Sequence, residues 1–178
     1  MKDIEEDYAL QPAIYDVIGK LLPNGGTVLE LGSGHGDAKL VEKYTVYAVE
    51  HDENWLDVTP GVEYIHAPIG RIKPTKWHPD QNKWYDSDII KNRITNLKYG
   101  LLIVDGPPAN IGRGGFLKYR DCFDSDAPVI VDDINRYEEW KIMKVLANRW
   151  NKDILILDTT IERMFAVIAY KEQLKLLL

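Results

Sequence analysis

Three glycines alternate with other residues in the segment from Glu30 to Asp37, at positions Gly32, Gly34 and Gly36. Because glycine lacks a Cβ atom, such a segment can turn tightly and bring its backbone close to a ligand. It follows a predicted strand and opens a predicted helix, where open α/β sheets bind nucleotide-like ligands. The dinucleotide fingerprint needs Gly or Ala where this chain has Asp37, and an acidic side chain there would oppose a pyrophosphate. The turn therefore predicts a ligand with a ribose but no phosphate at this point, such as S-adenosylmethionine (SAM).

A second carboxylate, Glu50, ends the next predicted strand and stands twenty residues after Glu30. That position suits a carboxylate that accepts hydrogen bonds from ribose hydroxyls, and Asp52 could share the task. The alternative interpretation is an acidic residue at a solvated strand end. The glycine turn beside it favours the ribose.

Acidic residues also end two later predicted strands, residues 101–105 and 128–132. Asp105, Asp132 and Asp133 would meet at the carboxyl edge of a parallel sheet, where such folds place their sites. Carboxylate oxygens are the ligands that Mg²⁺ and Ca²⁺ prefer, so the three predict a metal site. The alternative is that Asp133 caps the next helix and Asp132 accepts hydrogen bonds at the strand end.

Other polar and aromatic residues are ambiguous from sequence alone. Trp77, Trp84 and Tyr85 could form a lid or acceptor pocket, or simply pack a long loop onto the body. Arg113 could attract an acidic acceptor, although a solvated charged surface is the simpler interpretation. His35, His66 and His78 are not expected to act as bases.

Composition sets further limits. The 178 residues include 22 Lys and Arg against 28 Asp and Glu, a net charge of −6, which disfavours a nucleic-acid partner unless a local basic patch overrides it. Cys122 is the single cysteine, so no intrachain disulfide can form, consistent with a cytoplasmic location. No run of residues is long and apolar enough to span a bilayer, and we expect no membrane partner. Exposed aromatics and the apolar tail at 174–178 leave room for a homodimer.

Helix-like and strand-like segments alternate along the chain, which predicts an α/β layered fold with a mainly parallel sheet. We expect a single domain over residues 1–178, with an aromatic-rich insertion at 70–86. The last two strands are separated by a short connection and should pair antiparallel. Expected strands are residues 27–31, 45–50, 62–67, 101–105, 128–132, 154–157 and 164–170. Expected helices are residues 8–22, a short one through 40–41, one capped by Ser87, and 116–123. A last helix should open with an Asn135/Glu138 capping box and bury Tyr137, Trp140, Val145 and Leu146.

Two of these segments, Glu30–Gly36 and Ala48–Asp52, resemble the first two motifs of class I SAM-dependent methyltransferases. The resemblance extends over nearly the whole chain, and the later segments resemble a small branch of that family. It implies a Rossmann-like, doubly wound α/β fold: seven strands, mostly parallel, with the last antiparallel, in three α/β/α layers. The later segments are His66–Pro68, Trp84–Asp86, Val104–Pro108 and Val131–Asp133.

The resemblance also implies roles for single residues. The glycine turn would hold the methionine part of SAM, Glu50 its ribose, and the residues after the third strand its adenine. Asp105 would face the reacting centre, with Asp105 and Asp133 as catalytic candidates. The implied cofactor site comprises Glu30, Gly32, Ser33, Gly34, Gly36, Glu50, His51, Asp52, Ala67, Pro68 and Asp105.

The function implied is methyl transfer from SAM to a small-molecule acceptor, with a hydroxyl as the expected target. A divalent metal, Mg²⁺ or Ca²⁺, held by the three aspartates would lower the pKa of that hydroxyl. Two alternatives remain open. One is a nicotinamide-dependent oxidoreductase, against which Asp37 and the short chain both count. The other is a SAM-binding module without catalytic activity.

Overall fold

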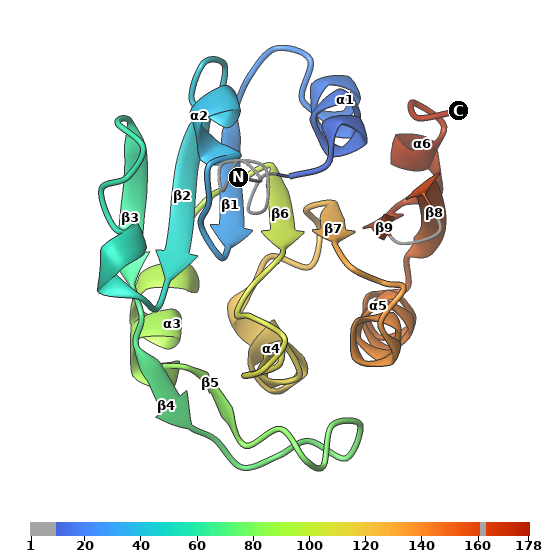
Figure 1. Cartoon of the computed structure of the whole chain (residues 1–178). Coiled ribbons are helices and arrows are strands. Elements are labelled where there is room, and N and C mark those ends of the chain that lie inside the picture. The colour runs from blue at the N-terminus through green and yellow to red at the C-terminus, as the bar shows by residue number, and fades with distance from the viewer. Residues whose placement is uncertain (1–9, 161–162) are drawn as a thin grey trace.

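Seven strands form one sheet in the order β3-β2-β1-β6-β7-β9-β8 in the computed structural model, which describes residues 10–160 and 163–178 (Figure 1). Every neighbouring pair from β3 to β7 is parallel, whereas β9 runs antiparallel to both β7 and β8. The predicted doubly wound sheet with an antiparallel last strand is confirmed. The strands are β1 (Thr27–Leu31), β2 (Thr45–Glu50), β3 (Val62–His66), β6 (Leu101–Val104), β7 (Val129–Val131), β8 (Asp153–Thr160) and β9 (Arg163–Ala169).

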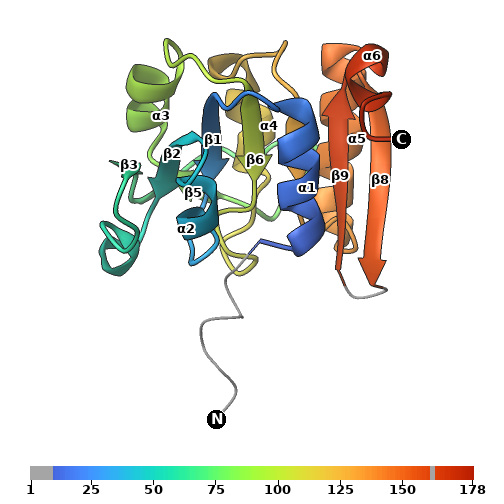
Figure 2. The same ribbon diagram turned by 90° about the horizontal axis from the view of Figure 1, so that it is seen from above.

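The central strands are apolar on both faces because helices cover both faces. In β1, Leu29 and Leu31 belong to the core cluster that includes α3 and α5 residues, whereas Val28 packs with α1. Helices α1, α2 and α6 lie on one side of the sheet and α3, α4 and α5 on the other, which makes three layers (Figures 1 and 2). The helices are α1 (Pro12–Leu21), α2 (Asp37–Leu40), α3 (Ser87–Ile94), α4 (Gly115–Tyr119), α5 (Tyr137–Trp150) and α6 (Lys171–Leu174), with 3-10 turns η2 (Glu53–Trp55) and η3 (Arg120–Cys122).

Strand β1 is where the chain order reverses, since β2 lies on one side of it and β6 on the other. Ligands of open α/β sheets bind at such a point, outside the carboxyl ends of the strands. The fold thus directs the glycine turn after β1 and the acids after β2, β6 and β7 to one edge of the sheet.

The residues of the predicted insertion pack against the body. Strands β4 (Ile69–Arg71) and β5 (Lys83–Tyr85) form a separate antiparallel pair. Trp84 and Tyr85 are fully buried, and the Trp84 ring stacks on Tyr119 with centroids 5.4 Å apart. Of the two interpretations of these aromatics, the structure supports packing for Trp84 and Tyr85.

Some local predictions were wrong. Asp86, not Ser87, caps α3, because its carboxylate accepts the backbone N–H groups of Asp88 and Ile89 at 2.9 and 3.0 Å. The first helix is described only from Pro12, and residues 8–9 of its predicted range lie outside the described residues.

Helix α5 also differs from its prediction. It begins at Tyr137 after Arg136, which makes no side-chain cap, so no capping box opens it. Tyr137 is 71% exposed and Trp140 is 38% exposed. Leu146 is buried as predicted and Val145 is half-buried, and the other buried residues of the helix are Glu139, Ile142, Met143 and Ala147. No helix in residues 10–160 and 163–178 is long and apolar enough to cross a membrane.

Candidate active site

A cleft of about 710 Å³ opens at the carboxyl ends of β1, β2, β6 and β7. All the site residues predicted from sequence line it, apart from Ala67 and Pro68. Segments far apart in the sequence therefore meet there. The predicted residues in its lining are Glu30, Gly32, Ser33, Gly34, Gly36, Glu50, His51, Asp52, Asp105, Asp132 and Asp133.

The glycine turn lies directly against the end of β6. Gly32 has a left-handed backbone (φ 98°), and a Cβ atom added there would lie 3.1 Å from the backbone nitrogen of Gly106. A Cβ atom on Gly106 would in turn lie 2.7 Å from the Cα atom of Gly32. Only glycine at both positions lets the two strand ends approach this closely. The result is a backbone-lined floor with no side chain in the way of a ligand.

Glu50 ties this turn to the end of β2. The side chain is 4% exposed, and its carboxylate accepts three backbone N–H groups: Ser33 at 3.1 Å, His51 at 2.6 Å and Asp52 at 2.8 Å. An ionised carboxylate has about four acceptor positions, so it can still accept a ligand hydroxyl. The fixed carboxylate fits the ribose role that the sequence predicts.

A second pair of acids, Glu30 and Asp37, lies buried beside the turn, 3% and 1% exposed. Burial, with Asp37 close by, raises the pKa of Glu30 well above its usual value. Ser33 Oγ donates to Asp37 Oδ2 at 2.7 Å. A side-chain hydrogen bond with Asp37 also raises the Glu30 pKa, so the proton that Glu30 keeps is shared between the two acids. The remaining lone pairs of this acid pair can accept from a cationic ligand group, such as the ammonium group of SAM.

His51 and Asp52 lie along the wall that Glu50 begins. The His51 ring meets the Tyr85 ring edge-on, with centroids 6.3 Å apart. Asp52 caps η2 by accepting the Asn54 backbone N–H at 3.0 Å, and the hydrogen bonds from Asn54 lower the Asp52 pKa.

Ala67 and Pro68 are set apart from the cleft. Ala67 is fully buried and donates its backbone N–H to the Glu50 carbonyl at 2.8 Å, whereas Pro68 is exposed. Neither residue lines the cleft. Their contact with adenine stays a prediction.

Arg113 is the functional residue that the sequence interpretation missed. Although a solvated surface was the simpler interpretation, its side chain is only 3% exposed. Its Nη2 donates to Asp105 Oδ1 at 3.0 Å and to Asp133 Oδ2 at 2.9 Å, and its Nη1 donates to the Asp132 carbonyl at 3.1 Å. Asp133 has a left-handed backbone (φ 59°), the kind of strain that collects at functional sites. One guanidinium thus gathers the acids at the ends of β6 and β7.

The predicted metal site at Asp105, Asp132 and Asp133 does not fit this arrangement. The guanidinium of Arg113 already bridges Asp105 and Asp133. Asp132 Oδ1 accepts Gln11 Nε2 at 2.7 Å and the Asp133 backbone N–H at 2.8 Å. Across the part of the chain that the structure describes, no three His, Cys, Asp or Glu side chains are grouped to hold a metal ion. Nor does Asp133 cap α5, since Arg136 is the residue that precedes that helix.

All three acids line the cleft, and the Asp105 side chain, 34% exposed, is more open to it than that of Asp133, 19% exposed. Burial raises the pKa of Asp105 to about 7, helped by Asp132 and Asp133 and opposed by Arg113. An acid in this range can hold or release a proton near neutral pH, as a general base requires.

Comparison with solved structures identifies the fold. A methyltransferase from Pyrococcus furiosus aligns with a TM-score of 0.54 and 15% identity over 91% of this chain and 87% of that one. The chain has the class I methyltransferase fold. The tRNA methyltransferase TrmK of B. subtilis aligns at 0.54, with 14% identity over 94% of this chain and 69% of that one.

MycE, a methyltransferase from the mycinamycin biosynthetic pathway solved with Mg and S-adenosylhomocysteine (SAH), also aligns at 0.54. Identity is 15% over 89% of this chain, which spans 45% of the MycE chain. No protein-family model and no curated protein matches the sequence. Nothing in these comparisons supports the nicotinamide-dependent oxidoreductase alternative.

Proposed function

We propose that this chain is a SAM-dependent methyltransferase that transfers the methyl group to a hydroxyl of a small-molecule acceptor. The observation that carries the proposal is the pairing of two features in one cleft. Glu50 is fixed by three backbone N–H groups at the end of β2, and the buried acid pair of Glu30 and Asp37 lies beside the glycine turn. Together they suit the ribose and the amino-acid end of SAM.

Each group of residues would bind a different part of the cofactor. The turn of Gly32, Ser33, Gly34 and Gly36 would hold the methionine part, with Glu30 and Asp37 accepting from its ammonium. Glu50 would bind the ribose, and His51 and Asp52 would flank the adenosine. Ala67 and Pro68 would border the adenine. When bound, SAM supplies the activated methyl group, and the chain supplies orientation and proton transfer.

Asp105 is the proposed general base. Arg113 holds its Oδ1, so its Oδ2 is the oxygen that can take the proton of an acceptor hydroxyl. With a pKa of about 7, Asp105 is half ionised at neutral pH. Asp133 binds Arg113 and also lies 2.8 Å from Nη1 of Arg136, so it acts by holding these cations in place rather than as the base.

Calorimetric titration tests the cofactor. We expect SAM and SAH to bind and NAD not to bind; uptake of NAD without SAM would overturn the proposal. Transfer of a labelled methyl group to a panel of hydroxylated acceptors then tests the base. D105N should lower the transfer rate about 10²- to 10⁴-fold, the range for losing a general base. The wild-type rate should rise between pH 6 and 8 as Asp105 ionises around its pKa of about 7. An unchanged D105N rate would exclude Asp105 as the base.

A further inference from the structure

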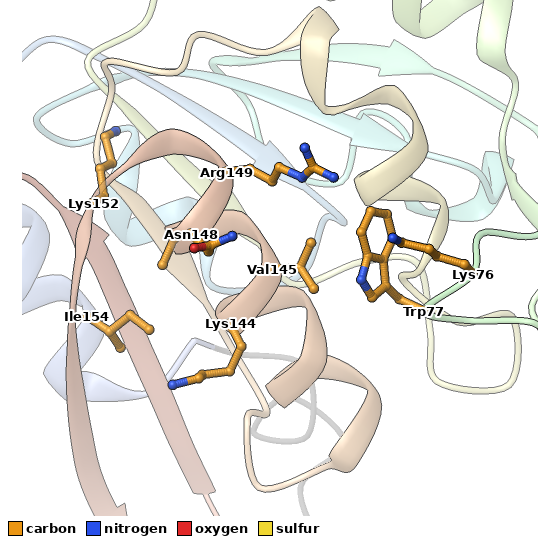
Figure 3. A pocket seen from close by; sticks show the side chains of 9 residues that line it. Lys76, Trp77, Lys144, Val145, Asn148, Arg149, Lys152 and Ile154 are labelled. Atoms are coloured by element: carbon orange, nitrogen blue, oxygen red, sulfur yellow. The ribbon is translucent and has the colours of Figure 1, made fainter.

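A second cleft, of about 600 Å³, lies away from the cofactor site, between α5, the insertion and the start of β8 (Figure 3). Four of the nine residues that line it are cationic and none is acidic. One comes from the insertion and three from residues 144–152, although the whole chain carries a net charge of −6. We call this the basic groove; its cations are Lys76, Lys144, Arg149 and Lys152.

The cations of the basic groove are largely unneutralised. Among the residues that the structure describes, no carboxylate lies within ion-pair distance of Lys76, Lys144 or Arg149. By contrast, Lys141, one turn earlier on α5, lies 2.8 Å from Glu138 Oε2. Lys152 differs from these three: it is buried, it donates to the Ala127 carbonyl at 2.6 Å, and burial lowers its pKa to about 8, so the three other cations carry the attraction for an anion. In Figure 3 the four side chains spread along the groove instead of converging on one point. That arrangement suits an extended anion better than a single small one.

Aromatic rings accompany these cations. Lys76 Nζ lies 4.9 Å and Arg149 Cζ 5.8 Å from the centroid of the Trp77 ring. Tyr137 is 71% exposed and Trp140 38% exposed on the outer side of α5. They offer flat surfaces on which planar groups can stack.

The outer side of α5 connects the basic groove to the cofactor cleft. Residues 137, 141, 144 and 148 follow the helical spacing that places side chains on one face. At its start, Asn135 and Arg136 line the cofactor cleft; at its end, Asn148 and Arg149 line the basic groove. A helix of 14 residues is about 21 Å long, so this face joins the two over a distance of several nucleotides.

We propose that the basic groove and the outer face of α5 bind a single-stranded nucleic acid. Such a strand carries one phosphate per nucleotide for the cations and one planar base per nucleotide for the rings. An acidic peptide would satisfy the cations but has no regular set of planar groups for Tyr137 and Trp140. The negative net charge does not prevent this, because exposed charges beyond about 8 Å are screened at physiological salt.

Fluorescence anisotropy with a labelled twelve-nucleotide strand of uridine tests the proposal on the full chain. We expect binding that weakens about 20-fold between 50 and 200 mM salt, as for about three neutralised phosphates on a single strand. K144E/R149E should weaken binding at least tenfold. Y137A/W140A, which removes the exposed rings, should weaken it about tenfold. The matched control R93E/K98E makes the same charge change at two exposed positions in and after α3 and should stay within twofold.

Several outcomes would overturn the proposal. One is equal loss in K144E/R149E and the control, which would mean general charge attraction. Another is displacement of the strand by polyglutamate at matched charge, which would assign the face to an acidic protein. The third is no binding at 50 mM salt. Calorimetric SAM affinity measured on the same variants should not change, so a failure of the cofactor proposal appears separately from a failure of this one.

Discussion

The cofactor cleft contains two clusters of buried acids that are satisfied in opposite ways. Beside the glycine turn, Glu30 and Asp37 share a hydrogen bond with each other, and neither forms an ion pair with a cation among the described residues. At the ends of β6 and β7, Asp105 and Asp133 share the buried guanidinium of Arg113. The first cluster is incomplete until a ligand brings donors to it. The second is complete within the chain.

This difference indicates where ligand specificity lies. Burying acids without a cation destabilises the folded state. A site can retain such acids when its ligand stabilises them on binding. Acids already paired with a buried arginine gain little from an added cation. The turn end is therefore the end that selects the cofactor, and the Arg113 end is a rigid frame for the reacting atoms.

The largest expected effect comes from removing the cation of the complete cluster. R113M leaves Asp105 and Asp133 facing each other, and Glu139 Oε1, which lies 3.9 Å from Arg113 Nε, loses this cation. We expect the free energy of unfolding in urea to fall by about 3–5 kcal/mol, the cost of breaking a buried pair from one side. The loss should shrink at pH 5, where Asp105, with its pKa of about 7, is protonated.

R136M is the matched control. Arg136 contacts the same Asp133 at 2.8 Å, but its side chain is 44% exposed. Loss of an exposed pair costs about 1 kcal/mol or less. Equal destabilisation by R113M and R136M would contradict the division into a complete and an incomplete cluster.

The next largest effect is expected from replacing Glu50, on the cleft wall between the two acid clusters. E50A removes the acceptor of three backbone N–H groups and of the proposed ribose contact. We expect SAM affinity, measured by calorimetry, to fall about 10- to 100-fold, which is about 1.4–2.7 kcal/mol. D52N, two residues away on the same wall, should stay within threefold. Unchanged affinity in E50A would remove Glu50 from the site.

Features that depend on a few neighbouring residues could be predicted from the sequence, whereas features that depend on contacts between distant residues could not. The strands follow from apolar runs such as residues 101–104, and the glycine turn and Glu50 follow from spacing along a few residues. Arg113 could not be found this way. It lies in an irregular loop without periodicity, and its partners are 8 and 20 residues away in sequence.

Helix α5 was mispredicted for the same reason. Glu139 is 2% exposed and lies close to Arg113, so a charged residue occupies the buried face. Tyr137 and Trp140 are exposed, although their large rings alone predict burial in the core. The helical pattern can be interpreted correctly only once the buried arginine is known. A long-range ion pair thus explains both errors.

A smaller effect tests the incomplete cluster. The pKa of Glu30 is raised, so the folded state holds its proton at pH values where the unfolded chain has released it. The stability due to this group is therefore greatest below its unfolded pKa and is lost as pH rises toward the folded pKa. E30Q cannot ionise, and we expect it to become more stable than the wild type by about 1–2 kcal/mol as pH rises from 5 to 8. Thermal unfolding across that range measures the change. E63Q, at an exposed acid on β3, should show no such trend.

The last prediction is that removing divalent metal ions has no effect. It tests whether the complete cluster of Asp105, Asp133 and Arg113 leaves room for a metal. A divalent ion at Asp105 and Asp133 would have to displace a guanidinium that makes ion pairs of 3.0 and 2.9 Å and is itself almost fully buried. An ion at Asp132 Oδ1 would also have to displace the two hydrogen bonds that this oxygen accepts. We therefore expect SAM affinity and methyl transfer to be unchanged by EDTA, and titration with Mn²⁺ followed by electron paramagnetic resonance to show no tightly bound ion. Activity that disappears in EDTA and returns with Mg²⁺ would mean that Arg113 leaves the acids during turnover. The distinction between the two clusters would then fail, because both would depend on something the chain does not supply.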